Sequence, residues 1–544
     1  MINKVFLLLA LAGMLGCVPA LGGILVSEPG NLRGSSYTNP IIHADYSDPD
    51  AVASPDGKTF WMTASSFQDS PGLPILKSTD LVNWELVNYA IDRVPPYEAY
   101  KGSPKHGHGV WAPSIKYYGG EYYIYWGDPD YGVFMIKTQD PSGDWSEPVL
   151  VREAKGMIDP TPFWDEDGKA YLANGWAASR AGFNSVITVS EMSSDGTKTI
   201  GAPKIVFDGN DGVNHTIEGP KMYKRDGYYY IFSPAGGVVN GWQLVMRSRN
   251  VYGPYESKIV MAQGDTDING PHQGAWIETP DAGDWFLHFQ DRGAYGRITH
   301  LNPVKWVDGW PVIGVDNDGD GCGNPVRKYP KPNLCPMSKS DSEDVSLLYQ
   351  WEANYNDHFG FDIPYGLKRI FGYKLEGPVV DIREVPNVWL MKFPAEDFTL
   401  TSKVRVSAKQ TSEDVASGIM VIGGDYARLG LKKAGNGFQV EYVVSTAAGN
   451  EDVKDLGVLK PTRVYEAGLY PNMECDLWLR VSVRKGAVCK FSYSTDGKTF
   501  SDVGEFKTDR GVWMGAKLGF FSITPAGIHD RGWIDVITSD LKVK

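Results

Sequence analysis

Beyond its first 20 residues, this 544-residue sequence has no apolar run of membrane-spanning length, no excess of positive charge and few stretches of helical periodicity. Lysine and arginine number 53 against 66 aspartate and glutamate, and the net charge of −13 argues against nucleic acid or an anionic membrane as a partner. Aromatic residues, in contrast, make up 12% of the chain. This composition favours an all-β protein, and the length predicts at least two domains.

The long apolar run is confined to the N-terminus. Residues 1–20 combine Lys4 with the run Val5–Ala12 and small residues near Cys17, which is typical of a secretory signal peptide. We therefore expect an exported, periplasmic protein. The sequence Met14-Leu15-Gly16-Cys17 resembles a lipoprotein signal, so either a lipid anchor at Cys17, on the outer membrane, or simple cleavage nearby is open.

Cysteine is scarce, with 5 residues in the chain. After Cys17, the remaining four form two local pairs, Cys322 with Cys335 and Cys475 with Cys489. An oxidising compartment permits a disulfide in each pair. Buried free thiols are the alternative.

Five aromatic-rich runs each follow a Gly-containing turn, at a period of roughly 50 to 60 residues. The turns are Asp56-Gly57, Gly119-Gly120, Asp167-Gly168, Asp226-Gly227 and Gly283-Asp284. A turn of this kind between two strand-like runs predicts a β-hairpin. The sequence therefore predicts a five-bladed β-propeller.

Carboxylates recur in phase with these turns. Eight residues before each of the first four turns stand Asp48, Trp111, Asp159 and Glu218, and His272 lies eleven residues before the fifth. Residues that begin the inner strands of a propeller face one central cavity, so we expect the three acids to meet there. The alternative, that Asp and Gly only decorate turns, does not explain acids in phase beside apolar strands.

Paired carboxylates at such a cavity suit the hydrolysis of a glycosidic bond. One carboxylic acid protonates the leaving oxygen, and a carboxylate on the other face activates water or attacks carbon. A surplus of aromatic rings also suits sugar binding, because apolar sugar faces stack on them.

The region behind the repeats has a different pattern. Residues 326–346 are rich in proline and serine and predict a linker after a propeller over residues 36–325. Residues 347–544 alternate apolar and polar side chains through Phe398–Val406, Gly418–Ile422 and Trp478–Val483, which predicts an antiparallel β-sandwich.

The motifs at the blade starts resemble those of glycoside hydrolase family 43. They are Asn39-Pro40-Ile41, Tyr46-Ser47-Asp48-Pro49-Asp50, Trp111-Ala112-Pro113, Ile158-Asp159-Pro160, Ile217-Glu218-Gly219-Pro220, and Gly296-Arg297 with Val307-Asp308-Gly309-Trp310-Pro311. The second half, opening at Leu348-Tyr349-Gln350-Trp351, resembles the concanavalin-like β-sandwich of the family's β-xylosidase branch.

The resemblance implies an inverting, exo-acting hydrolase in which Asp48 is the general base, Glu218 the general acid, and Asp159 the residue that tunes and orients the acid. Asp45 is the rival base, but it lies outside the eight-residue phase and is interpreted as a supporting or surface residue. Arg297 matches an arginine that binds sugar hydroxyls, with a surface arginine as the alternative. Trp111 is expected to form a wall of the sugar pocket, with a core tryptophan as the alternative.

The resemblance requires no cofactor for the chemistry and allows a structural calcium. His272 matches a histidine that lies beside such a cation in relatives; a hydrogen-bonded core histidine is the alternative. Asp316-Asn317-Asp318-Gly319-Asp320-Gly321 imitates a calcium loop, but Arg327 stands where a bidentate Glu is needed. A turn rich in Asp and Gly explains it better, with a looser calcium site as the alternative.

The expected substrate is a plant polysaccharide or oligosaccharide. We place release of terminal α-L-arabinofuranosyl residues from hemicellulose first, with a β-D-xylosidase or a dual-specificity enzyme as the alternative. A retaining fructan hydrolase and a secreted, non-catalytic sugar-binding protein are more remote alternatives.

Overall fold

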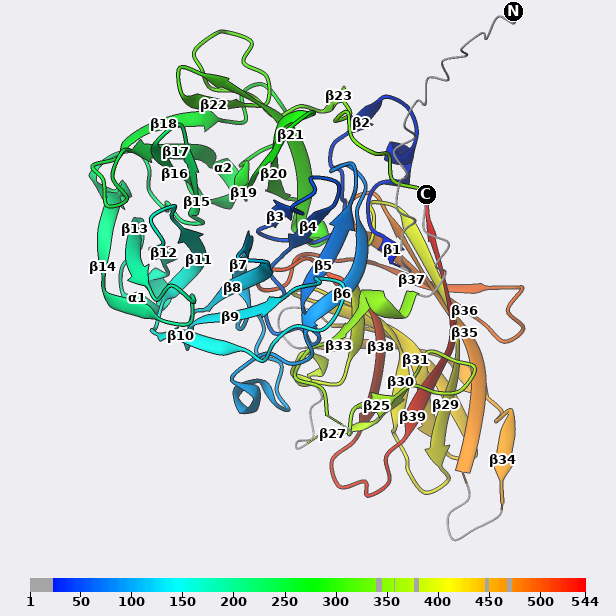
Figure 1. Ribbon diagram of the computed structural model, residues 1–544. Helices are drawn as coiled ribbons and strands as arrows, with labels where there is room; N and C mark the ends of the chain where they lie inside the picture. Colours follow the sequence, from blue (N-terminus) through cyan, green and yellow to red (C-terminus); the bar gives the residue numbers. More distant parts are fainter. Residues whose placement is uncertain (1–22, 339–344, 357, 376–380, 446–449, 467–471) are drawn as a thin grey trace, which may run out of the picture.

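Glycines at the predicted turns let the chain reverse between the first two strands of each blade. In the computed structural model, Gly57, Gly168 and Gly227 have φ values of 66°, 82° and 74°, a region that favours glycine. The structure describes residues 23–338, 345–356, 358–375, 381–445, 450–466 and 472–544. The prediction of an all-β propeller followed by a sandwich is confirmed (Figure 1).

Five sheets form the blades, and each runs in chain order from an inner to an outer strand. Blade 1 contains β3 (Asp50–Ala53), β4 (Phe60–Thr63), β5 (Gly72–Ser78) and β6 (Glu85–Ile91). Blade 2 contains β7 (Trp111–Tyr118), β8 (Glu121–Asp128), β9 (Gly132–Thr138) and β10 (Val149–Glu153). Blade 3 contains β11 (Met157–Trp164), β12 (Ala170–Trp176), β13 (Val186–Met192) and β14 (Thr199–Asp208). Blade 4 contains β15 (Lys221–Arg225), β16 (Tyr228–Ala235), β17 (Trp242–Ser248) and β18 (Glu256–Met261), and blade 5 contains β19 (His272–Thr279), β20 (Gly283–Asp291), β21 (Arg297–Val307) and β22 (Trp310–Ile313).

Segments before and after the five blades form additional strand pairs. Strand β1 (Ile24–Leu25) pairs with β6 at the outer edge of blade 1, and β2 (Ser36–Thr38) pairs with β23 (Lys328–Pro330). Strand β23 belongs to the segment predicted as a linker. Helical turns are short: α1 (Ala178–Ala181), α2 (Gly237–Asn240), and the 3₁₀ turns η1 (Pro29–Leu32), η2 (Tyr97–Tyr100), η3 (Gly209–Asp211), η4 (Gly293–Tyr295), η5 (Val345–Leu348) and η6 (Ile382–Glu384).

Two sheets, antiparallel except for the parallel pair β27 and β38, make up the sandwich. One has the order β24 (Tyr349–Trp351), β28 (Trp389–Lys392), β38 (Lys517–Thr524), β30 (Ala416–Ile422), β31 (Tyr426–Ala434), β32 (Gly437–Ser445) and β33 (Glu451–Leu459), with β27 (Tyr373–Lys374) beside β38. The other has the order β25 (Gly360–Phe361), β26 (Lys368–Phe371), β39 (Trp533–Val543), β29 (Phe398–Lys409), β35 (Asn472–Arg484), β36 (Val488–Ser494) and β37 (Ser501–Lys507), with β34 (Arg463–Tyr465) beside β35. Alternate residues of β29 are buried, as expected for a sheet with one face on a core.

One apolar core cluster contains residues of both the propeller and the sandwich. Ala294, Tyr295 and Ile298 of blade 5 pack with the buried residues of the sandwich. The hydroxyl of Tyr295 donates to the carbonyl oxygens of Glu396 and Arg484 in the sandwich, at 2.9 and 3.1 Å. The two domains are therefore packed against each other rather than merely tethered.

A buried ion cluster also crosses this interface. Nζ of Lys517 in β38 lies 2.7 Å from Asp69 of the propeller and 2.5 Å from Glu352 of the sandwich. Burial raises the pKa of Asp69 to about 6. Burial also opposes ionisation of Glu352, but Lys517 and His106 outweigh it and hold the pKa of Glu352 far below its usual range.

Neither of the two local cysteine pairs forms a disulfide. Cys322, Cys475 and Cys489 are free thiols, and Cys475 and Cys489 are buried, which is the alternative that the sequence left open. Cys489 in β36 lies opposite Val483 of β35, eight residues along that strand from Cys475. Eight strand residues span about 26 Å, whereas disulfide-bonded Cα atoms lie within about 7 Å of each other. Closeness in sequence did not translate into closeness across the sheet.

The predicted signal peptide and Cys17 lie outside the described residues, so export and lipidation stay predictions. Among the residues that the structure describes, no helix is long and apolar enough to cross a membrane.

Candidate active site

The start of each inner strand carries a local backbone distortion. Residues with positive φ recur there in all five blades, and the pairing register shifts beside three of them, in β7, β11 and β19. These residues are Asp48 (55°), Ala112 (27°), Asp159 (54°), Gly219 (58°) and Gln273 (37°). Such bulges re-aim side chains and are common next to active sites. The repeated distortion explains why the residues in phase point into one cavity.

Asp48 is held by side chains from two other segments of the propeller. Its Oδ2 accepts a hydrogen bond of 2.6 Å from the hydroxyl of Ser65, and Nη1 of Arg297 lies 3.3 Å from its Oδ1. The Ser65 hydroxyl also accepts from the backbone N–H of Ala112, at 2.8 Å. These contacts fix the orientation of a carboxylate whose side chain is only 4% exposed.

Asp159 and Glu218 are adjacent but differ in exposure. Oδ2 of Asp159 accepts from the backbone N–H of Gly219 at 2.8 Å, directly after Glu218. Asp159 is buried, and this burial, together with the nearby Glu218 and Asp48, raises the pKa of Asp159 well above its usual range. The side chain of Glu218 is 30% exposed, and its Oε1 lies 2.8 Å from Nε2 of His272.

One pocket of about 230 Å³ brings these groups together. Five of the six predicted site residues line it: Asp48, Trp111, Asp159, Glu218 and Arg297. Trp513 of the sandwich lines it as well, with its ring centroid 6.1 Å from that of Trp111. The pocket is smaller than the roughly 300–1,000 Å³ typical of drug-sized ligands, and it suits a single sugar unit.

Trp513 was missed from the sequence, whereas Asp45, interpreted there as a supporting or surface residue, is a buried supporting residue. Trp513 lies in the loop between β37 and β38, about 300 residues after Glu218, so no local signal links it to the pocket. Asp45 is buried and its Oδ1 accepts from the backbone N–H of Arg297, while its Oδ2 accepts from that of Gly515 in the sandwich. Asp45 therefore supports Arg297 and also joins the domains.

His272 offers little to a cation. Its Nε2 is engaged with Glu218, and its Nδ1 is buried without a partner. Among the described residues, no group of three His, Cys, Asp or Glu side chains gathers around it. Calcium prefers six to eight oxygen ligands, so this donor set is a poor fit. A calcium ion here stays a prediction, and no chemical step is assigned to it.

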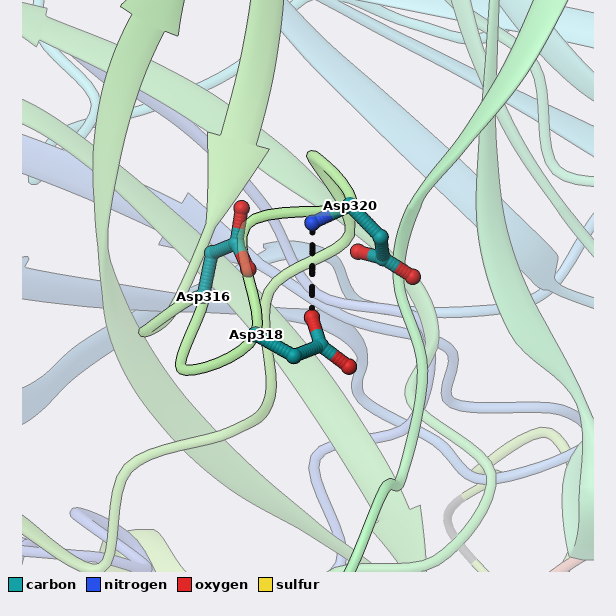
Figure 2. Close-up of side chains that lie close together, drawn as sticks. All are labelled: Asp316, Asp318 and Asp320. Atoms are coloured by element: carbon teal, nitrogen blue, oxygen red, sulfur yellow. Dashed lines mark hydrogen bonds between the residues drawn. The ribbon is translucent and has the colours of Figure 1, made fainter.

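The Asp-rich turn after β22 uses its carboxylates locally. Oxygens of Asp316, Asp318 and Asp320 lie within 4.8 Å of one another (Figure 2). Asp316 accepts from the backbone N–H groups of Gly319 and Gly321, and Asp318 from that of Asp320. The carboxylates thus stabilise the turn itself, and the looser calcium site stays a prediction.

The catalytic half of the chain matches a known family. The model for glycosyl hydrolases family 43 matches residues 37–311, half of the sequence and most of the propeller. This chain belongs to glycoside hydrolase family 43. The model of the β-xylosidase C-terminal concanavalin A-like domain matches residues 341–538. The protein is therefore a glycoside hydrolase with the domain pair expected from its sequence.

Relatives of this family 43 enzyme include proteins of nearly equal length. A putative β-xylosidase of Xylanibacter ruminicola is 33% identical over 504 residues, 90% of this chain and 87% of the relative. A β-xylosidase of Formosa agariphila is 32% identical over 548 residues, 93% of this chain and 90% of the relative. The non-reducing end α-L-arabinofuranosidase BoGH43B of Bacteroides ovatus is 31% identical over 322 residues, 56% of this chain and 57% of the relative.

Solved structures agree with the fold. A variant of the family 43 protein BlXynB from Bacillus licheniformis has a TM-score of 0.76 at 25% identity, covering 94% of this chain and all of that one. The similarity therefore extends over the propeller and the sandwich together.

Proposed function

We propose that this enzyme is an exo-acting, inverting hydrolase that removes a terminal pentose from plant hemicellulose, with β-D-xylosides as the preferred substrates. The observation that carries the proposal is the small pocket that contains Asp48, Asp159 and Glu218 and has Trp513 of the sandwich in its wall. A pocket of one-sugar size between two domains suits cleavage at a chain end.

We assign the two catalytic carboxyl groups from their exposure and their family motifs. The buried Asp48, oriented by Ser65 and Arg297, acts as the general base that takes a proton from water. The more exposed Glu218 acts as the general acid that protonates the leaving oxygen, since the rest of the substrate must extend toward solvent. Asp159 orients this acid through its hydrogen bond to the N–H of Gly219.

The proposed preference for xylosides over arabinosides reverses the expectation from the sequence, which placed arabinosides first. The two relatives that match nine-tenths of this chain carry β-xylosidase in their names, whereas the arabinofuranosidase relative matches 56% of it. The second candidate, α-L-arabinofuranosidase action, is supported by that shorter match at 31% identity.

Initial rates on matched 4-nitrophenyl β-D-xylopyranoside and α-L-arabinofuranoside test the preference. We expect kcat/KM to be at least about 10-fold higher for the xyloside, a difference of about 1.4 kcal/mol in transition-state binding. The Asp48→Asn variant, which lacks the base, should be inactive on both and exclude a contaminating enzyme. A preference for the arabinoside would instead select the second candidate.

Proton NMR of the first-formed sugar tests inversion. A β-xyloside should release α-xylose before mutarotation, because water attacks the face opposite the leaving group. Initial release of β-xylose would contradict the inverting mechanism.

A further inference from the structure

Lys221, the first residue of β15 in blade 4, extends across the propeller axis. Its side chain is 1% exposed. Nζ donates to the carbonyl oxygen of Pro113 at 2.8 Å and to Oγ of Ser114 at 3.1 Å, both in blade 2, and lies 3.9 Å from Asp50 in blade 1. Blade 4 of a five-bladed ring is adjacent only to blades 3 and 5, so these contacts span the centre.

Lys221 and the residues that its ammonium group contacts lie within three residues, along the chain, of residues that line the pocket. The pairs are Asp50 with Asp48, Pro113 with Trp111, and Lys221 itself with Glu218. The network reaches blade 3 as well, because Oγ of Ser114 donates to the carbonyl oxygen of Pro160, the residue after Asp159. One buried amine thus connects the strand starts at or beside which all three acids lie.

Burial of an ammonium group is costly unless it is paired and hydrogen-bonded. The ammonium group of Lys221 donates to two neutral acceptors. It shares the carboxylate of Asp50 with Lys116, whose Nζ lies 3.8 Å from Oδ2 of Asp50. Lys221 opposes the effects that raise the pKa of Asp159.

We propose that Lys221 is a positioning residue for the hydrolysis. Its ammonium group holds the inner strands of blades 1, 2 and 4 at a fixed spacing, and through them it fixes the positions of Asp48 and Glu218. This proposal rests on the catalytic roles assigned to Asp48 and Glu218.

Profiles of kcat/KM against pH test the proposal with Lys221→Met and the control Lys116→Met, which also removes a lysine beside Asp50. The charged groups around Asp159 are Glu218, Asp48 and Lys221; Arg297 in turn faces Asp48, and His272 faces Glu218. Loss of the Lys221 charge disfavours the ionised form of the nearby carboxyl groups. The low-pH side of the kcat/KM profile, its acid limb, should therefore move to higher pH in Lys221→Met and stay in place in Lys116→Met. We also expect kcat to fall about 10- to 100-fold, as for a small misplacement of catalytic groups. If Lys221→Met has the acid limb and the kcat of the wild type, the proposal is overturned.

The double variant Asp50→Asn/Lys221→Met guards against a failure to fold, because it removes the buried carboxylate together with its cation. We expect the acid limb to stay displaced. Return of the wild-type profile would mean that Lys221 only neutralises Asp50, and would overturn the proposal. Failure of the proposed function is distinguishable, since it would appear as an inactive wild type or a fully active Asp48→Asn variant.

Discussion

Asp159 is the pocket residue whose environment most clearly opposes its charge. It is buried, faces Glu218 and Asp48, and has its pKa raised well above the usual range. A carboxyl with a higher pKa in the folded than in the unfolded chain contributes stability at low pH, and this contribution is lost as the pH rises through the folded pKa. The role proposed for this residue therefore opposes stability.

Replacement of Asp159 by Asn removes the titration and keeps an oxygen for the N–H of Gly219. We expect the Tm of Asp159→Asn, relative to wild type, to rise between pH 4 and pH 8, by about 1 °C or more, since one pKa unit corresponds to about 1.4 kcal/mol. Activity should be lost. Calorimetry across this pH range gives the comparison, and a Tm difference that falls with pH would contradict the burial argument.

Repetition made the three acids predictable from the sequence. Each blade repeats one turn and one strand start, so the phase located Asp48, Asp159 and Glu218 without any knowledge of contacts. Ser65 and Lys221 do not stand at the repeated distance from a turn. They reach the site through side chains that cross between blades, which only the folded arrangement determines.

The loop between β37 and β38 is the element that brings the sandwich to the pocket. Its Gly515 N–H binds Asp45, its Arg510 lies 3.1 Å from Asp291, and its Trp513 lines the pocket. The sequence predicted the strands on either side through their alternation. It could not predict the loop's contact with the propeller, because nothing in the local pattern encodes docking.

Trp513→Ala should weaken substrate binding with little effect on folding. The side chain is 52% exposed, so we expect the free energy of unfolding to change by less than about 0.5 kcal/mol. Loss of a ring from the pocket wall should lower kcat/KM about 10-fold, mainly through KM. Phe361→Ala, which removes another exposed aromatic of the sandwich away from the pocket, is the control and should change neither value. Unchanged kinetics in Trp513→Ala would exclude a role for the loop in binding.

At the scale of the whole molecule, the shared core and the buried ion cluster predict that the two domains unfold together. A chain that ends near residue 346 would expose the apolar surface around Tyr295 and leave Asp69 without Lys517. The sequence predicted both domains and their order. Their interface could not be predicted, because Lys517 and Asp69 are 448 residues apart.

Lys517→Met leaves Asp69 and Glu352 buried without their cation. We expect a loss of about 3–5 kcal/mol in the free energy of unfolding at pH 7, the usual cost of an uncompensated buried charge. Urea denaturation measures this loss, and Lys542→Met, which breaks an exposed lysine–aspartate pair of the sandwich, should cost less than about 1 kcal/mol. Equal effects of the two variants would show that the cluster does not stabilise the interface.

The proposed mechanism depends above all on protonation of the leaving oxygen by Glu218. The most direct test compares Glu218→Gln with wild type on xylobiose and on 2,4-dinitrophenyl β-D-xyloside, whose leaving group departs without a proton. We predict a loss of about 10²- to 10⁴-fold in kcat on xylobiose and less than about 10-fold on the dinitrophenyl substrate. Equal losses on both substrates would contradict the assignment of Glu218 as the general acid.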